Sequence, residues 1–385
     1  MFGGTLGLSR IREMERKLGV PSGKYKCILV AGSNGKGSVA TMIARGLEER
    51  GGKIGLYLSP HIDTPRERIS INGKMISKNE MAREYGIVEK IARRMKDRPS
   101  FFEIFTAMAL DYFARKKVEW AVLEVGMGGR LDATNVVEPE LSVITRVDLE
   151  HVQKLGGTLS AIAHEKAGVM RQGKVCVTGA KGEALAALMG EGEARGAHVV
   201  AVHLKYAGKL ALLGEHQKRN AAVAEEALRR LGVGGSAIAK GLARADIAGR
   251  LEIAGRKPLV IQDGAHNPAA ARELAAAVRG MRLRQPLVLV FGAMRDKDYD
   301  GVLAALAPLA RAVVVNRPKV ERAEEAGKIA EAARKYNKDV RVVEDVRKSV
   351  KEAKKIAGKG GTVLMAGSIY MLSEARGKNE LKIDA

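Results

Sequence analysis

Short apolar runs rich in β-branched residues alternate with stretches of helical spacing along most of the chain. This alternation predicts strands in parallel sheets that are covered by helices on both faces. Ala-rich, charged stretches at 79–96, 103–115 and 323–335 predict helices, and 181–196 predicts a surface helix. The predicted strands are 26–31, 53–57, 118–124, 141–145, 174–178, 199–202, 258–262, 286–291, 312–315, 340–343 and 362–366.

These strands are too many for one ordinary open sheet. A break in the pattern near residues 245–256 separates a first series from a second. We therefore expect an α/β protein with an N-terminal domain at 1–248 and a smaller C-terminal domain at 249–385.

The composition supports a globular protein. Hydrophobic residues make up 46% of the 385 residues, which excludes global disorder, but aromatic residues make up only 4%. No apolar run approaches the ~18 residues of a membrane-spanning helix, and the first ten residues lack a signal-peptide pattern. We therefore expect a cytoplasmic protein, with Cys27 and Cys176 as buried thiols.

The net charge of +22, from 66 Lys and Arg against 44 Asp and Glu, indicates anionic partners. Nucleic acid, a membrane surface and phosphorylated substrates would each account for it. The basic residues are dispersed, aromatic stacking residues are scarce, and nucleic-acid-binding motifs are not seen. The sequence therefore favours small phosphorylated substrates, with no nucleic-acid or membrane partner.

A glycine-rich loop with the sequence GSNGKGS at 32–38 follows the strand 26–31 and precedes a helical stretch. Glycines let the backbone wrap a phosphate, and the following helix N-terminus adds favourable potential. Lys36 can reach the outer phosphates, and the Ser38 hydroxyl can hold Mg²⁺. The loop predicts nucleoside-triphosphate binding, but alone it does not separate a kinase, an ATPase and a ligase.

Two carboxylates follow predicted strands, where parallel sheets place their ligands. Glu124 ends an apolar run before a Gly-rich turn, and Asp263 follows the strand 258–262. Two other polar residues have plain structural interpretations: Ser59 as a helix cap, and Asn267 before Pro268 as the start of a helix.

The loop and a dozen further blocks, in order, resemble the folylpolyglutamate synthase/dihydrofolate synthase family of the Mur ligase superfamily. The glycine between Lys36 and Ser38 is the most discriminating detail, and EVGMGGRLDATN at 124–135 is the longest block. The resemblance spans about residues 5–376. Its other blocks are LGLSRI (6–11), SPHI (59–62), RISING (68–73), FFE and TA (101–107), DLEH (148–151), EKAG (165–168), GEHQ with Asn220 (214–220), GRLE (249–252), DGAHNP (263–268), DKD (296–298) and GSIY (367–370).

The resemblance implies a P-loop ATPase-like N-terminal domain with a parallel sheet and a Rossmann-like C-terminal domain. It implies a ligase that uses ATP to convert a pterin carboxylate to an acyl phosphate, which the amino group of L-glutamate then attacks. The acid would be dihydropteroate, a reduced folate or both. The protein is expected to be a monomer that acts on small molecules.

The resemblance also assigns a site. Two Mg²⁺ ions would be held by Ser38, Ser59, Glu124, His151 and Lys166, the last as a CO₂-derived carbamate, with K⁺ as a further candidate cation. ATP would be bound by Ser33, Asn34, Gly35, Lys36, Gly37, Ser38, Asn220, Arg250 and Asp263. The residues expected to be catalytic are Lys36, Lys166 and His266. The pterin acid would contact Gly7, Phe101, Phe102, Glu103, Leu131, Asp132 and Ala133.

Some alternatives stay open. Phe101 and Phe102 are as compatible with core packing as with stacking on a pterin. Glu150 stands where the family usually has Asp, and the chain is shorter than most family members, which leaves the acceptor acid uncertain. A Mur-type ligase for another carboxylate is a rival interpretation. A nucleic-acid-stimulated ATPase and a small-molecule kinase explain fewer of the blocks.

Overall fold

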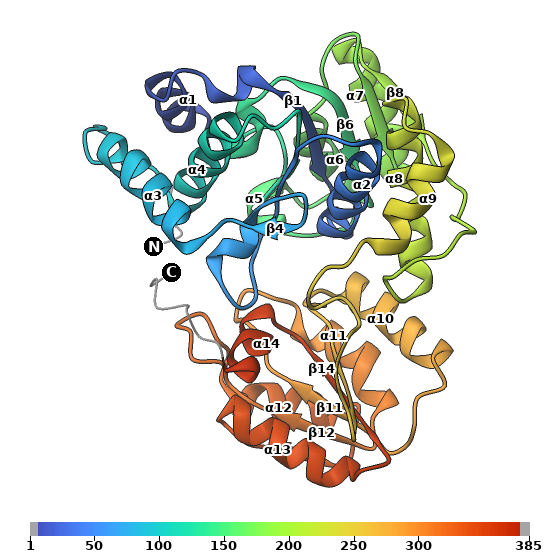
Figure 1. Cartoon of the computed structure of the whole chain (residues 1–385). Helices are drawn as coiled ribbons and strands as arrows, with labels where there is room; N and C mark the ends of the chain where they lie inside the picture. The colour runs from blue at the N-terminus through green and yellow to red at the C-terminus, as the bar shows by residue number, and fades with distance from the viewer. Residues whose placement is uncertain (1–6, 378–385) are drawn as a thin grey trace.

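The computed structural model describes residues 7–377, which form a larger N-terminal body and a smaller C-terminal body (Figure 1). Leu6, the first residue of the LGLSRI block, lies outside the described range. In the described residues, the first body holds an eight-stranded sheet and the second a six-stranded sheet. Among residues 7–377, no helix combines the length and apolar character that crossing a membrane requires.

The larger sheet has the order β4-β3-β2-β5-β1-β6-β7-β8. The six strands from β2 to β8 in this order run parallel, and the edge strands β3 and β4 are antiparallel to their neighbours. The strands are β1 (Lys26–Ala31), β2 (Ile54–Tyr57), β3 (Ile69–Ile71), β4 (Lys74–Met75), β5 (Trp120–Glu124), β6 (Pro139–Ile144), β7 (Val175–Thr178) and β8 (His198–Ala201).

Helices bury both faces of this sheet. In β1, Cys27 and Leu29 point into a core shared with α1, α4 and α6, whereas Ile28 and Val30 point into a core shared with α2, α8 and α9. The helices are α1 (Ser9–Lys17), α2 (Lys36–Arg50), α3 (Lys78–Ala92), α4 (Phe101–Arg115), α5 (Val152–Leu155), α6 (Leu159–Ala167), α7 (Gly182–Arg195), α8 (Glu215–Arg230) and α9 (Gly235–Arg244), with 3₁₀ turns η1 (Pro21–Lys24), η2 (Pro65–Arg68) and η3 (Ala133–Val136).

The smaller sheet has the order β13-β12-β11-β14-β10-β9, with β9 antiparallel to β10 and the other pairs parallel. Helices α10, α11 and α12 cover one face, and α13 and α14 cover the other. The elements are β9 (Glu252–Arg256), β10 (Leu259–Gln262), α10 (Pro268–Gly280), β11 (Leu287–Phe291), α11 (Tyr299–Leu306), η4 (Ala307–Leu309), β12 (Ala312–Val315), α12 (Ala326–Arg334), β13 (Val340–Val342), α13 (Val346–Ala357), β14 (Thr362–Ala366) and α14 (Ile369–Arg376).

All eleven predicted strands are present, but the expectation of purely parallel sheets was wrong at the edges. The short strands β3, β4 and β9 were missed, and β9 lies inside the predicted break at 245–256. These strands bury little: both residues of β4 are exposed, and β9 has no fully buried residue. Edge strands of this kind lack the apolar run by which the inner strands were recognised.

The two bodies are joined by side-chain contacts as well as by the connecting chain. Ile62, in the loop after β2, packs into the core of the C-terminal body with Val260 and Leu372. Arg376 of α14 forms an ion pair with Asp63, with 3.4 Å between the charged atoms. The loop after β2 therefore contacts the C-terminal body directly, close to the ends of the central strands.

Candidate active site

The glycine-rich loop turns directly from the buried strand β1 into α2. Gly32 and Gly35 have φ angles of 141° and 90°, which favour glycine. A Cβ on Gly32 would collide with the Thr145 side chain, and one on Gly35 would lie 2.6 Å from Asn220 Oδ1. The loop is therefore held between the end of β6 and helix α8, which places Asn220 beside Gly35.

Lys36 folds back over this loop. Its Nζ donates to the carbonyl oxygens of Gly32, at 2.9 Å, and Ser33, at 3.4 Å. The Ser33 hydroxyl exchanges hydrogen bonds with the backbone of Asp148. The loop thus presents a flexible cation at a helix N-terminus, which is the arrangement that phosphate binding requires.

Glu124 lies at the carboxyl end of β5 beside the start of α2. Its Oε2 accepts a hydrogen bond of 2.8 Å from the backbone N–H of Ser59, and a Cβ on Gly37 would lie 3.4 Å from its Oε1. Burial raises the pKa of Glu124, although the Lys36 ammonium opposes this. The structure therefore brings Lys36, Gly37, Ser59 and Glu124 together. A cavity of about 200 Å³ reaches this point, and Arg250 and Ile369 also line it.

Lys166 is fully buried and bonds Glu150, with 2.7 Å between Nζ and Oε1. Burial lowers the pKa of Lys166 to about 8 despite the Glu150 charge. Burial alone would raise the pKa of Glu150, but Lys36 and Lys166 outweigh it and lower the pKa to about 2. An anionic Glu150 therefore sits among ammonium groups, and sequence reasoning had not assigned it a role.

His151 follows Glu150 and is the N-cap residue of α5, with a φ of 46°. The residue is exposed overall, yet partial burial of its side chain, together with the Lys297 charge, lowers its pKa to about 4. His151 is therefore a neutral imidazole at pH 7 and can offer a lone pair to a metal.

The C-terminal body supplies the opposite wall. The carboxylate of Asp263 accepts hydrogen bonds from the backbone N–H groups of Leu251, at 3.0 Å, and Ala265, at 2.8 Å. His266 Nδ1 lies 2.8 Å from the carbonyl oxygen of Gly264, which makes Nδ1 the protonated nitrogen. Burial lowers the pKa of His266 to about 4, so its Nε2 is a free acceptor in the neutral ring.

The residues expected to bind the pterin acid lie near the end of β5, on the side of α4. A Cβ on Gly126 would lie 2.6 Å from the Phe102 ring and 3.1 Å from Asp132 Oδ2. Phe101 and Phe102 are half-buried, and each packs against a neighbouring ring, Phe105 or Tyr57. Leu131 and Ala133 flank Asp132 in the same turn, and Gly7 precedes α1.

Two of the residues predicted to contact the pterin acid, Glu103 and Asp132, also form hydrogen bonds that stabilise the fold. Glu103 caps α4 and accepts two 3.0 Å hydrogen bonds from Arg10 Nε, which ties α4 to α1. Asp132 accepts from the backbone N–H groups of Met127 and Thr134 and from the Thr134 hydroxyl. Glu103 therefore shapes the start of α4, to which Phe102 belongs, and Asp132 shapes the turn after β5.

Two positively charged side chains near the site, Arg68 and Lys297, were not predicted from the sequence, and neither was the anionic Glu150. Arg68 is buried, donates from Nε to His61 Nδ1 at 2.8 Å, and lies over the Phe101 and Phe105 rings. Its positive charge is one of several that oppose the rise in the pKa of Glu124 caused by burial, so Arg68 lies near that carboxylate. Lys297, from the DKD block, acts in the same way on His151 and His266. Both residues lie in blocks that were recognised, but nothing in the sequence indicated that their side chains point inward.

Within residues 7–377, no group of three or more His, Cys, Asp or Glu side chains is arranged to hold a metal ion. The predicted metal ligands are not a cluster of that kind, because they combine Glu124 and His151 with the hydroxyls of Ser38 and Ser59. The Glu124 carboxylate and the two hydroxyls are hard oxygen donors of the kind that Mg²⁺ prefers, whereas the His151 imidazole is a softer ligand. An ammonium on Lys166 does not suit a cation, whereas a carbamate there would.

Two family models match the chain: the Mur ligase middle domain over residues 30–209, and the Mur ligase, glutamate ligase domain over residues 249–369. The fold and the site therefore define a ligase of the Mur type. A *Bacillus subtilis* protein named dihydrofolate synthase/folylpolyglutamate synthase is 34% identical over 97% of this chain and 95% of its own length. The chain belongs to the folylpolyglutamate synthase/dihydrofolate synthase family.

A *Halobacterium salinarum* relative, named probable bifunctional folylpolyglutamate synthase/dihydropteroate synthase, is 39% identical over 91% of this chain. The chain spans only 46% of that relative's length. The *Mycobacterium tuberculosis* folylpolyglutamate synthase, solved with ADP and AMPPCP, superposes with a TM-score of 0.90 at 33% identity, covering 97% of this chain and 95% of that one. A bifunctional folylpolyglutamate synthase/dihydrofolate synthase with Mn, AMPPNP and L-glutamate bound gives 0.86 at 29% identity, covering 98% and 95%.

Proposed function

We propose that the chain is an ATP-dependent ligase that joins L-glutamate to a pterin carboxylate, either dihydropteroate, a reduced folate or both. The observation that carries this proposal is the meeting of the glycine-rich loop, buried Glu124 and the Lys166–Glu150 pair at one sheet edge. Such a site can gather a triphosphate, metal ions and two anionic substrates. The ligand-bound relatives support the choice of ATP, a divalent cation and glutamate.

The reaction begins when a carboxylate oxygen of the pterin acid attacks the γ-phosphorus of ATP. The bond from that phosphorus to the β–γ bridging oxygen breaks, and ADP and an acyl phosphate form. Lys36 and the N–H groups of residues 33–38 hold the phosphates, and Arg250 clamps them from the second domain. Asn220 and Asp263 hold the nucleoside end.

The α-amino group of glutamate then attacks the acyl carbon, loses a proton, and inorganic phosphate leaves. His266, fixed through Nδ1, offers Nε2 to orient the amine or the transferred phosphoryl group. Phe101, Phe102 and the turn at Leu131, Asp132 and Ala133 would hold the pterin acid, with Gly7 nearby. Water must be excluded because it would hydrolyse the acyl phosphate.

We propose two Mg²⁺ sites, one at Ser38, Ser59 and Glu124 and one at Glu124, His151 and Lys166. When bound, these ions neutralise charge on the phosphates. A Lys166 with a pKa of about 8 is an unprotonated amine more often at neutral pH than an ordinary lysine. Such an amine attacks CO₂, loses a proton and becomes an anionic carbamate. K⁺ remains a further candidate cation.

We also propose that the boundary between the two domains lies between residues 248 and 249, just before Arg250. Domain closure would then assemble the site from Lys36, Glu124 and Lys166 on one side and Arg250 and His266 on the other. We propose that the protein works as a monomer on small molecules.

The proposed function is tested by phosphate release from ATP in the presence of glutamate and a panel of dihydropteroate, tetrahydrofolate and methanopterin-like acids. We expect release only when glutamate and a pteroate-type acid are both present, with one glutamyl unit added per turnover by mass spectrometry. Release that needs DNA or RNA, or that occurs without glutamate, would contradict the proposal.

A further inference from the structure

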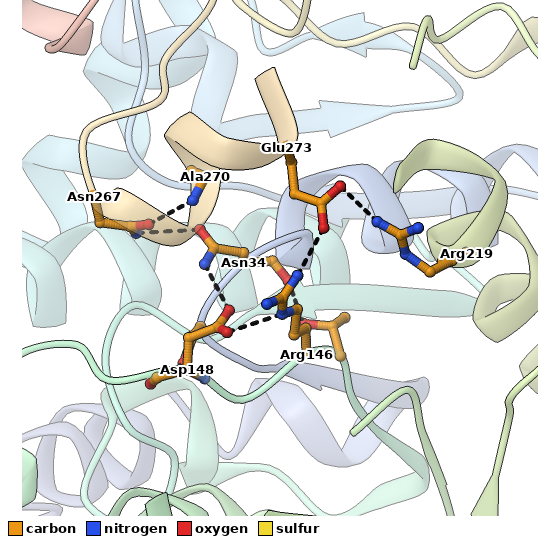
Figure 2. A network of polar contacts seen from close by, with 9 residues as sticks. Asn34, Arg146, Asp148, Arg219, Asn267, Ala270 and Glu273 are labelled. Atoms are coloured by element: carbon orange, nitrogen blue, oxygen red, sulfur yellow. Dashed lines mark hydrogen bonds and ion pairs between the residues drawn. The ribbon is translucent and has the colours of Figure 1, made fainter. Parts of the chain in front are cut away.

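A network of polar contacts crosses the boundary between the two bodies beside the glycine-rich loop (Figure 2). Glu273 of α10 lies at its centre. Its Oε1 is 2.8 Å from Arg146 Nη1, and its Oε2 is 2.5 Å from Arg219 Nη2. Arg146 follows β6 and Arg219 lies on α8, so one carboxylate of the C-terminal body binds two separate elements of the N-terminal body.

Arg146 also holds the glycine-rich loop itself. Its backbone carbonyl oxygen accepts a 2.7 Å hydrogen bond from the N–H of Ser33, and its Nε lies 2.8 Å from Asp148 Oδ1. Asp148 Oδ2 in turn accepts a 2.9 Å hydrogen bond from Asn34 Nδ2. The residue that pairs with Glu273 is therefore attached to the loop through both its backbone and its side chain.

A second link runs from the loop to the start of α10. Asn34 Oδ1 accepts a 3.2 Å hydrogen bond from Asn267 Nδ2, while Asn267 Oδ1 caps α10 by accepting from the N–H of Ala270 (Figure 2). Asn267 caps α10 and Glu273 lies within it, so both links fix the position of α10 against the loop. His266, directly before Asn267, is carried into the site by the same placement.

We propose that Glu273 is a positioning residue, which holds the C-terminal body against the glycine-rich loop so that a nucleotide meets an assembled site. Glu273 itself need not touch a substrate. It acts through Arg146 and Arg219, which set the distance between the two walls. This proposal does not depend on which carboxylic acid the ligase uses.

The ion pairs of Glu273 are weak enough to allow the two bodies to move together and apart. The side chains of Arg146, Arg219 and Glu273 are 44%, 33% and 28% exposed, so salt can screen them. Loss of the carboxylate charge would lower the closed fraction, and the apparent nucleotide affinity falls in proportion to that fraction. The rate at saturating nucleotide should change little, because bound ATP still favours the closed state.

The test compares Glu273→Gln with Arg272→Gln, an exposed charge on the same helix. Glu273→Gln should raise the KM for ATP about three- to tenfold and change kcat less than about twofold, whereas Arg272→Gln should change neither. Arg219→Gln, on the other body, should raise the KM for ATP in the same direction but by less, because Arg146 still pairs with Glu273. The double variant should be no worse than Glu273→Gln alone, because Glu273→Gln already removes the pair with Arg219.

A second readout does not require activity. Spin labels on Met189→Cys in α7 and Val342→Cys in β13 report the distance between the bodies, and the two native cysteines are buried. Glu273→Gln should broaden this distance distribution toward longer values in low salt, and high salt should broaden that of the wild type. Unchanged distances and KM in Glu273→Gln and Arg219→Gln would overturn the proposal, as would a loss of thermal stability alone.

Discussion

The N-terminal wall of the site and the boundary between the two bodies hold their charges in different ways. In the N-terminal body, Lys166 is 0% exposed and its partner Glu150 only 13% exposed, so neither charge can easily return to water. At the domain boundary, Arg146, Glu273 and Arg219 remain partly solvated. Removing one partner of a buried pair costs about 3–5 kcal/mol, whereas an exposed pair contributes about 0.2–1 kcal/mol.

This difference separates chemistry from closure. The buried charges of the N-terminal wall are fixed before any substrate arrives, which is what charge stabilisation in a transition state requires. The boundary pairs are weak enough to open and close. We therefore expect changes in the first wall to act on turnover and folding, and changes at the boundary to act on nucleotide affinity.

The largest effect should come from Lys36→Ala, which removes the cation that lies over the glycine-rich loop. We expect kcat/KM to fall by about 10²- to 10³-fold, because preorganised charges at a transferring group are worth about 3–4 kcal/mol. Phosphate release measures this, and Lys90→Ala on the exposed surface of α3 is the control. Near-normal turnover in Lys36→Ala would show that phosphates bind elsewhere.

Lys166→Ala should lower turnover by about 10²-fold, a loss typical of one missing charged group at a metal site. Added formate or acetate should restore part of it, because either anion can occupy the place of a carbamate. The same anions should not rescue Lys36→Ala. Full activity of Lys166→Ala without supplement would end the carbamate assignment, and so would a failure of bicarbonate depletion to slow the wild type.

In bicarbonate-depleted buffer, where Lys166 is not carbamylated, Glu150→Gln should destabilise the fold by about 3–5 kcal/mol, because it leaves the Lys166 ammonium buried beside an uncharged amide. Chemical denaturation at pH 7 measures this. The double variant Glu150→Gln with Lys166→Met should recover much of the stability, since it removes the stranded charge as well. If Glu150→Gln alone is neutral, Lys166 is already uncharged in the folded protein, and the simple ion pair is wrong.

The parts of the fold and site that could be predicted from the sequence are those that depend on residues close together in the chain. The inner strands of both sheets were predictable because burial on both faces gives them apolar runs, as in β1 and β11. The glycine-rich loop and Glu124 were predictable because their chemistry depends on neighbours in the chain. The edge strand β9 was not, because it packs too little to leave a pattern.

The contacts between the walls could not be predicted, since they join residues far apart in sequence. Arg146 and Glu273 are separated by 127 positions and resemble ordinary solvated charges. Glu150 was noticed only as a departure from the family, although its pairing with Lys166 orders the N-terminal wall. Spacing alone cannot show which of many charged side chains turns inward.

The smallest effect we expect is a loss of stability in acid that involves both walls. Burial lowers the pKa of His266 to about 4, against 6.5 in an unfolded chain, so the unfolded state binds more protons between these values. The contribution of neutral His266 to the free energy of unfolding is therefore fully present above pH 6.5 and is lost as the pH falls toward 4. His61, with a pKa lowered to about 3, acts in the same direction from the loop after β2.

Between pH 7 and pH 5, we expect His266 to account for a loss of about 1–2 kcal/mol, because each displaced pKa unit corresponds to about 1.4 kcal/mol once the group titrates. Urea denaturation at both pH values measures it, and His266→Gln should flatten the slope by that amount. His203→Gln is the control, because His203 is exposed to solvent in the loop after β8. If the two variants gave the same slope, His266 would titrate normally and its burial against the C-terminal wall would be looser than the structure indicates.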